Sequence, residues 1–178
     1  GFNLALPRGT GVATYGYNLA LAARSEGLGI EALYGLRAPF NRKLRDIMFY
    51  ESMGNEHATR SPKPWHPAYY REFSMLLRPK TAREISTNGE VISQQFAHRM
   101  PEFDRIFTAP DMFDQAVRHF RRFGLFLPVR VPNPPDIMHW TYPLPVKMLG
   151  TKNIYTLHDL VPLRLPYASL DNKRAYYK

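Results

Sequence analysis

The chain has 178 residues, which suits one domain, and its 44% hydrophobic content argues against an intrinsically disordered protein. It has no cysteine, which excludes disulfides, thiolate nucleophiles and cysteine-ligated zinc. The net charge of +9 favours an anionic partner, such as a phosphorylated ligand, a nucleic acid or an acidic lipid surface.

The first 35 residues predict a strand, a glycine loop, a helix and a second strand. Residues 1–6 resemble a strand end, apolar residues three and four apart predict a helix over 12–26, and residues 30–34 predict the next strand. The loop before the helix consists of Arg8, Gly9, Thr10 and Gly11. Glycines there allow a positive φ or a close approach to a ligand, and a helix N-terminus favours phosphate. A tight turn that serves packing alone explains these residues equally well.

The periodicity of apolar residues is weaker in the middle of the chain. We expect helices near 43–50 and 68–77, with a proline-rich loop between them at 59–67 and a further loop at 83–88. A clearer succession follows, with a strand at 104–109, a helix at 112–123, an extended segment at 125–131 and a rigid turn at 132–135.

Two further apolar runs, at residues 136–140 and 154–157, have lengths that suit buried strands of a parallel sheet. His139, Thr141 and Tyr142 come at the end of the first run, and His158 and Asp159 follow the second. Ligands bind at the carboxyl ends of parallel strands, so we expect both groups and the glycine loop to meet at one sheet edge. The alternative is a core histidine at 139 with aromatic residues that cap the sheet. Because neighbours on a strand point in opposite directions, a direct His158–Asp159 hydrogen bond is not expected.

Basic and aromatic residues interleave over residues 118–127. Arg118, Arg121 and Arg122 in this segment suit contact with an anionic membrane surface. A solvated basic helix face with its phenylalanines in the core is the alternative, and nucleic acid is disfavoured because no RNA-binding signature is present. No metal site is expected, since His57 and His66 lack a paired ligand spacing. No apolar run approaches the roughly 20 residues of a membrane-spanning helix.

Three segments, taken in order, resemble the N-terminal lobe of family-four, group-1 glycosyltransferases, particularly mannosyltransferase-like bacterial members. They are GTGVATYGYNLALAARSEG (9–27), DIMHWTYPLP (136–145) and NIYTLHDLVPLRLP (153–166), within roughly the first 35 and last 45 residues. The resemblance implies an α/β, Rossmann-like fold with a mostly parallel sheet and helices on both faces, which is half of a GT-B enzyme. Residues 1–178 would form the acceptor-binding lobe, and the nucleotide-sugar lobe would lie outside this chain. A helix that opens near residue 169, with Ser169 or Asp171 as N-cap, and reaches Lys178 without a C-cap agrees with that expectation.

The same resemblance implies a hexosyltransferase that moves a sugar from a nucleotide-diphosphate donor to a glycan or lipid-linked acceptor, with retention and without a metal or other cofactor. It implies a cytoplasmic enzyme, peripheral at the inner face of the membrane where the acceptor is a lipid. His158 and Asp159 would be catalytic, with His158 near the transferred sugar, and residues 8–11 would lie near the donor diphosphate or the acceptor. Thr141 stands where many family members have a second histidine.

Two alternatives remain open. One is a Rossmann-like module that binds a nucleotide or phosphate without transfer activity, although Glu31 begins the second strand rather than ending it, which disfavours NAD. The other is a basic domain that binds a membrane or a nucleic acid.

Overall fold

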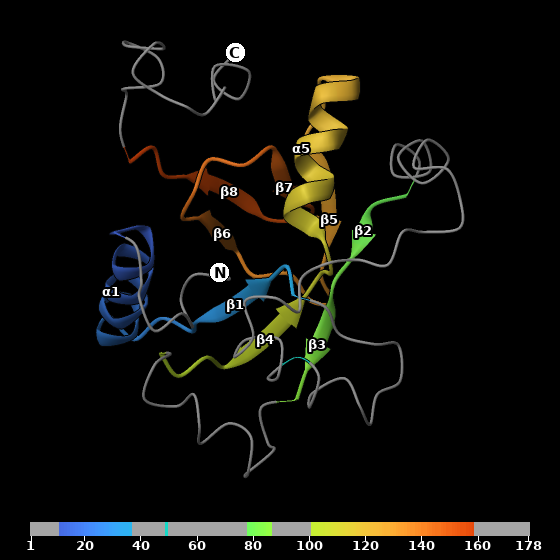
Figure 1. Ribbon diagram of the computed structural model, residues 1–178. Coiled ribbons are helices and arrows are strands. Elements are labelled where there is room, and N and C mark those ends of the chain that lie inside the picture. The colour runs from blue at the N-terminus through green and yellow to red at the C-terminus, as the bar shows by residue number, and fades with distance from the viewer. Residues whose placement is uncertain (1–10, 37–48, 50–77, 87–100, 159–178) are drawn as a thin grey trace.

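The computed structural model describes residues 11–36, 49, 78–86 and 101–158, which form an α/β fold (Figure 1). The bounds of its elements are α1 Gly11–Ser25, β1 Glu31–Tyr34, β2 Lys80–Thr81, β3 Arg83–Ile85, β4 Arg105–Thr108, α5 Met112–Phe123, β5 Leu127–Arg130, β6 Ile137–Trp140, β7 Val146–Met148 and β8 Lys152–Tyr155. The strand at 1–6, the helices near 43–50 and 68–77 and the helix after residue 169 are predictions that fall wholly or almost wholly outside these residues.

The strands form three small sheets, in the orders β1-β4-β3, β2-β5-β7 and β6-β8. Pairing is parallel between β1 and β4, β2 and β5, β5 and β7, and β6 and β8, whereas β3 runs antiparallel to β4. The expected parallel character is therefore confirmed in the described part of the chain, within a mixed architecture.

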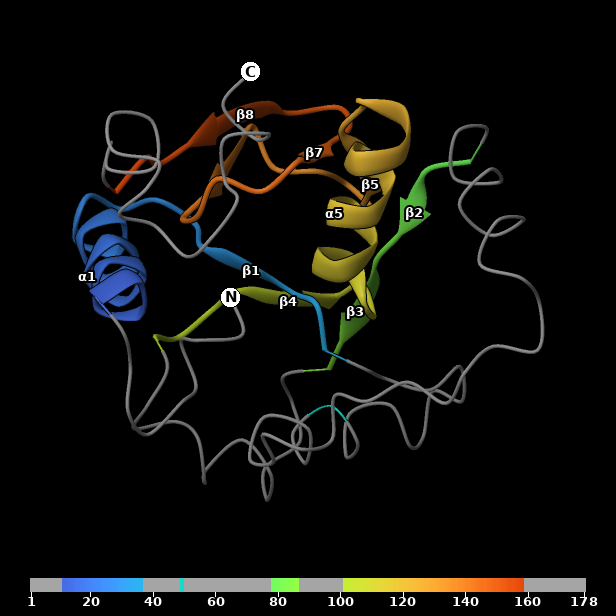
Figure 2. The same cartoon turned by 45° about the horizontal axis from the view of Figure 1, so that its top comes forward.

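A single extended run joins the first two sheets. β2 pairs with β5, β3 pairs with β4, and only Ala82 separates β2 from β3. The Ala82 N–H donates to the Arg130 carbonyl at 2.8 Å, which continues the ladder across the joint. Two views place α5 beside β5 and α1 at the opposite end of the fold (Figure 2).

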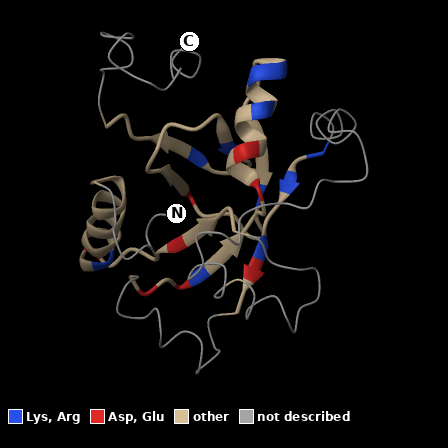
Figure 3. Cartoon of the chain, in the orientation of Figure 1, with Lys and Arg blue, Asp and Glu red and all other residues tan. Residues whose placement is uncertain are grey.

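Helix α5 has the bounds that the sequence predicted. Its buried residues Met112, Gln115, Ala116 and His119 recur at helical spacing and form one face. Gly124 ends the helix in a left-handed conformation with φ 66°, and its N–H donates to the Phe120 carbonyl at 2.8 Å. Basic residues gather in the C-terminal half of α5 (Figure 3), where they complement the helix dipole.

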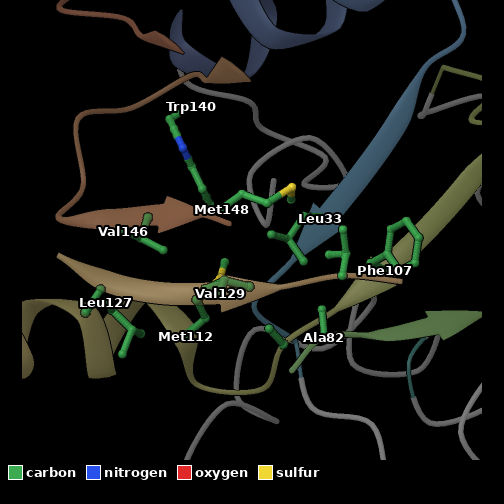
Figure 4. Packing of buried hydrophobic residues seen from close by; sticks show 12 residues of the cluster. Leu33, Ala82, Phe107, Met112, Leu127, Val129, Trp140, Val146 and Met148 are labelled. Carbon is green, nitrogen blue, oxygen red and sulfur yellow. The ribbon is translucent and has the colours of Figure 1, made fainter. Parts of the chain in front are cut away.

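The hydrophobic core lies where the two larger sheets and α5 meet (Figure 4). It contains one or two side chains from each of β1, β4, α5, β5, β6 and β7, including Leu33 of β1, Phe107 of β4, Met112 of α5, Val129 of β5 and Val146 of β7. Ala82, at the joint between β2 and β3, belongs to the same cluster. One continuous core therefore supports both sheets.

Several element predictions were wrong. The loop expected at 83–88 contains β3, whose alternation of half-buried, exposed and buried side chains covers only three residues, too few to show a period of two. Strand β7 was not expected, and β8 begins and ends two residues before the predicted run. The pair β6–β8 is not buried on both faces, since Ile137 is 54% and Ile154 is 48% exposed.

Candidate functional site

Polar side chains meet at the carboxyl ends of β6 and β8, beside α1. His139 lies in β6 and Thr141 just after it. Thr156 and His158 follow β8. Because the two strands are parallel, with Trp140 opposite Tyr155, the residues that follow them leave the sheet at the same edge. We call these four residues together with Tyr15 of α1 the His–Thr–Tyr cluster.

The Thr156 hydroxyl joins the strands to the helix. Its Oγ1 lies 2.6 Å from His139 Nε2 and 3.2 Å from the Tyr15 hydroxyl. Each hydroxyl both donates and accepts, so the three groups form a continuous hydrogen-bonded chain for either neutral tautomer of His139. The contact closes a separation of 141 positions between Tyr15 and Thr156.

His158 is held by the turn that follows β6. Its Nε2 lies 2.6 Å from the Thr141 carbonyl oxygen. A carbonyl oxygen only accepts, so Nε2 carries the hydrogen, and Nδ1 of the neutral ring has a free lone pair. The His158 side chain is exposed, so a ligand can reach Nδ1.

Tyr15 lies against both imidazoles. Its ring meets His158 edge-on with centroids 5.1 Å apart, and it meets His139 edge-on at 6.2 Å. Such edge contacts fix the orientation of aromatic rings. Helix α1 therefore supplies an aromatic side to a site that is otherwise built from strand ends.

The cluster contains no carboxylate, lysine or arginine side chain. Burial lowers the pKa of His139 from its ordinary value of 6.5, so this ring is neutral at pH 7. The other members are a tyrosine, two threonines and an exposed histidine. A set of hydroxyl and imidazole groups beside an aromatic ring suits a ligand that is itself rich in hydroxyl groups.

Asn153 fixes the strands that carry the cluster. Its Oδ1 accepts from Trp140 Nε1 and from the Met148 N–H, both at 2.8 Å. Its Nδ2 donates to the carbonyls of Met148 at 2.9 Å and Thr151 at 3.2 Å. Trp140 also stacks on Tyr155, its register partner. One side chain thereby ties β6, β8 and the end of β7 into a unit.

The structure brings together three of the residues singled out in the sequence, namely His139, Thr141 and His158. Tyr142 is half-buried in the following turn, where its carbonyl accepts from the Leu144 N–H at 2.9 Å. Arg8, Gly9, Thr10 and Asp159 lie outside the described residues.

The positive φ considered for Gly11 is not found, because Gly11 is the first residue of α1 and its φ is not in the left-handed region. Among the described residues, an added Cβ there would meet no atom within 4 Å. A close approach of Gly11 to a ligand stays a prediction. A close approach within the chain is found at Gly35, where a Cβ would lie 2.7 Å from the Phe113 ring.

Tyr15 and Thr156 were not predicted as site residues, because both lie within apolar patterns of the sequence. Thr156 lies two positions before His158, a spacing that places two side chains on the same side of an extended segment. Tyr15 lies one helical turn after Gly11. Both spacings relate these residues to segments that the sequence had already indicated as candidate binding sites, at 8–11 and at 158–159.

Within the part of the chain that the structure describes, no group of three or more His, Asp or Glu side chains is placed to hold a metal ion. In that same part, no helix has the length and apolar character needed to cross a membrane. Comparisons of the chain with protein-family models, with curated proteins and with solved structures found no match. The functional interpretation therefore rests on the residues and their geometry.

Proposed function

We propose that the chain is the acceptor-binding lobe of a GT-B glycosyltransferase, and that it holds a hydroxyl-rich acceptor at the His–Thr–Tyr cluster. The observation that carries this proposal is the meeting of His139, Thr156 and His158 at the carboxyl ends of two parallel strands. This is the edge at which open α/β sheets bind ligands. It is also where the two strand-end motifs that resemble group-1 glycosyltransferases fall.

The arrangement of the elements supports a Rossmann-like lobe. Four parallel strand pairings and the continuous extended run through Ala82 are consistent with a larger, mainly parallel sheet. Helix α1 directly precedes β1 in the chain, as the first helix of a strand–helix–strand unit precedes its second strand. We interpret the described residues as the framework of that sheet.

The chemistry of the cluster suits recognition of an acceptor. Nδ1 of His158 is free to accept a hydrogen from a sugar hydroxyl, while Thr141 holds the ring in one tautomer. The chain formed by Tyr15, Thr156 and His139 offers further neutral donors and acceptors. Holding a hydroxyl in line with the anomeric carbon of a nucleotide-sugar donor lowers the barrier to transfer. We infer a mannosyltransferase-like enzyme of the cytoplasm that acts on a glycan or lipid-linked acceptor, with retention and without a metal.

The test is sugar transfer by the protein expressed from its complete gene. Transfer from labelled nucleotide-diphosphate sugars, including GDP-mannose, is measured for the wild type and for the His158→Ala and Lys152→Ala variants. Lys152 is an exposed residue at the other end of β8 and is the matched control. We expect His158→Ala to lower turnover by roughly 100-fold or more, as loss of a positioned acid–base group does, while thermal denaturation stays unchanged.

Two outcomes contradict this proposal. Unchanged turnover in His158→Ala removes this residue from the site. Binding of a nucleotide diphosphate by the wild type, with no transfer from any donor, supports the Rossmann-like binding module instead.

A further inference from the structure

The C-terminal half of α5 has an outer face made of arginines. Arg118, Arg121 and Arg122 are exposed and, being three and four residues apart, lie on one side of the helix. The face opposite to them is buried in the core. Asp114 lies in the first turn on the same exposed side, four residues before Arg118, whereas Arg121 and Arg122 lie in the last turn.

Two large apolar side chains follow the arginines. Gly124 turns the chain in a left-handed conformation, and after it Leu125 is 54% and Phe126 is 36% exposed. The Phe126 ring packs edge-on against the rings of Phe120 and Tyr155, and each pair of ring centroids is 5.9 Å apart. The apolar residues are therefore presented from a fixed position, beside the last turn of the helix.

We propose that this surface docks on an anionic phospholipid bilayer. We call it the basic–apolar tip, and it consists of Arg118, Arg121, Arg122, Leu125 and Phe126. Lipid headgroups supply the negative charge that three neighbouring arginines attract, and the interface beneath the headgroups receives leucine and phenylalanine. The chain charge of +9 adds a long-range attraction of the same sign. Exposed Leu125 distinguishes this partner from a nucleic acid, because phosphate contacts gain nothing from an aliphatic side chain.

The basic–apolar tip lies close to the His–Thr–Tyr cluster. Phe126 contacts Tyr155 of β8, and Thr156 of the cluster is the next residue in the chain. A protein docked through the tip holds the cluster near the bilayer, within reach of an acceptor anchored in it. This last consequence rests on the proposed transferase function, whereas docking itself does not.

The test is sedimentation of the full-length protein with vesicles, without any sugar donor. Vesicles of phosphatidylcholine are compared with vesicles that contain about 30% phosphatidylglycerol, at about 0.05 M and about 0.5 M NaCl. The variants are Arg118→Gln/Arg121→Gln/Arg122→Gln, the corresponding triple lysine variant, and Leu125→Ser. Arg130→Gln is the matched control, because Arg130 is an exposed arginine at the far end of β5 from the tip.

We expect the wild type to bind the anionic vesicles and to be released by salt. Loss of the three arginines weakens binding on the order of 100-fold, at about fivefold for each basic residue near the surface. The lysine variant and Arg130→Gln bind like the wild type. Leu125→Ser weakens binding to vesicles about threefold or more, since a buried apolar side chain is lost from the interface, and it leaves any binding to duplex DNA or RNA unchanged.

Three results overturn the proposal: equal vesicle binding by the wild type and the triple glutamine variant, wild-type binding by Leu125→Ser, or binding to nucleic acid with none to vesicles. A transfer assay with a water-soluble acceptor separates this proposal from the proposed function. Failure of docking leaves transfer to that acceptor intact, and failure of transfer leaves docking intact.

Discussion

Thr156 joins α1 to the β6–β8 pair by a side-chain hydrogen bond to Tyr15. Its hydroxyl bonds both His139 and Tyr15, and no charged group takes part. Hydrogen bonds among neutral groups depend on which partner holds each hydrogen. The protonation state of His139 therefore determines the direction of each hydrogen bond from His139 through Thr156 to Tyr15. This protonation state can be measured through its effect on stability.

Burial lowers the pKa of His139 below its ordinary value of 6.5. The unfolded chain takes up a proton there near pH 6.5, and the folded protein does so only at lower pH. Between these two pKa values the unfolded state binds more protons, so the free energy of unfolding falls as the pH is lowered from 6.5. Well above pH 6.5, His139 is neutral in both states and its contribution to the free energy of unfolding is present in full.

The measurement is urea denaturation of the wild type and of His139→Gln between about pH 8 and about pH 5. Subtraction of the two curves removes the other titrating groups. We expect the stability advantage of the wild type to shrink toward acid pH. A difference that stays constant with pH would mean that His139 is solvated like a surface histidine.

At the scale of elements, the β6–β8 pair depends on Asn153 more than on burial. The outer residues Ile137 and Ile154 are about half exposed, so this pair gains less from the hydrophobic effect than the central strands do. Four side-chain hydrogen bonds from Asn153 compensate for this deficit.

We expect Asn153→Ala to lower the free energy of unfolding by about 3 kcal/mol. It leaves the indole N–H of buried Trp140 and the Met148 N–H without their acceptor, and each unsatisfied group costs roughly 1–3 kcal/mol. Chemical denaturation measures the loss, with Lys152→Ala as control, because Lys152 is the exposed neighbour on the same strand. A loss below about 0.5 kcal/mol, typical of surface positions, would show that the turn after β7 holds without Asn153.

Helices and strands could be predicted from the sequence where apolar residues recur regularly over many positions. Helix α5 has twelve residues with a regular buried face and a glycine at its end, so both bounds could be read. Strands β3 and β7 have three residues each, and only their hydrogen-bonding partners define them. His139, Thr141 and His158 could be found because polar residues interrupt apolar runs there. Thr156 and Tyr15 could not, because their roles depend on a contact between distant segments.

At the scale of the whole molecule, the three small sheets differ in hydrogen bonding but share a core. Side chains from β1, β4, β5, β6 and β7 belong to one buried cluster, and Ala82 lies within it at the joint between β2 and β3. A shared core and a continuous extended run couple the sheets energetically. We therefore expect the described strands to unfold as one cooperative unit.

Val129→Ala tests this coupling. Val129 is fully buried in β5, and loss of two methyl groups with partial collapse of the cavity should lower stability by about 2–3 kcal/mol. Native-state hydrogen exchange should then show the same decrease for the Ile106 and Phe107 amides of β4 as for those of β5, although β4 and β5 do not pair directly. Lys147→Ala, an exposed change on β7, should alter neither set. If protection fell in β5 and β7 alone while β4 kept the wild-type rates, the sheets would be separate units, and the joint at Ala82 would act as a hinge between them rather than as part of a common framework.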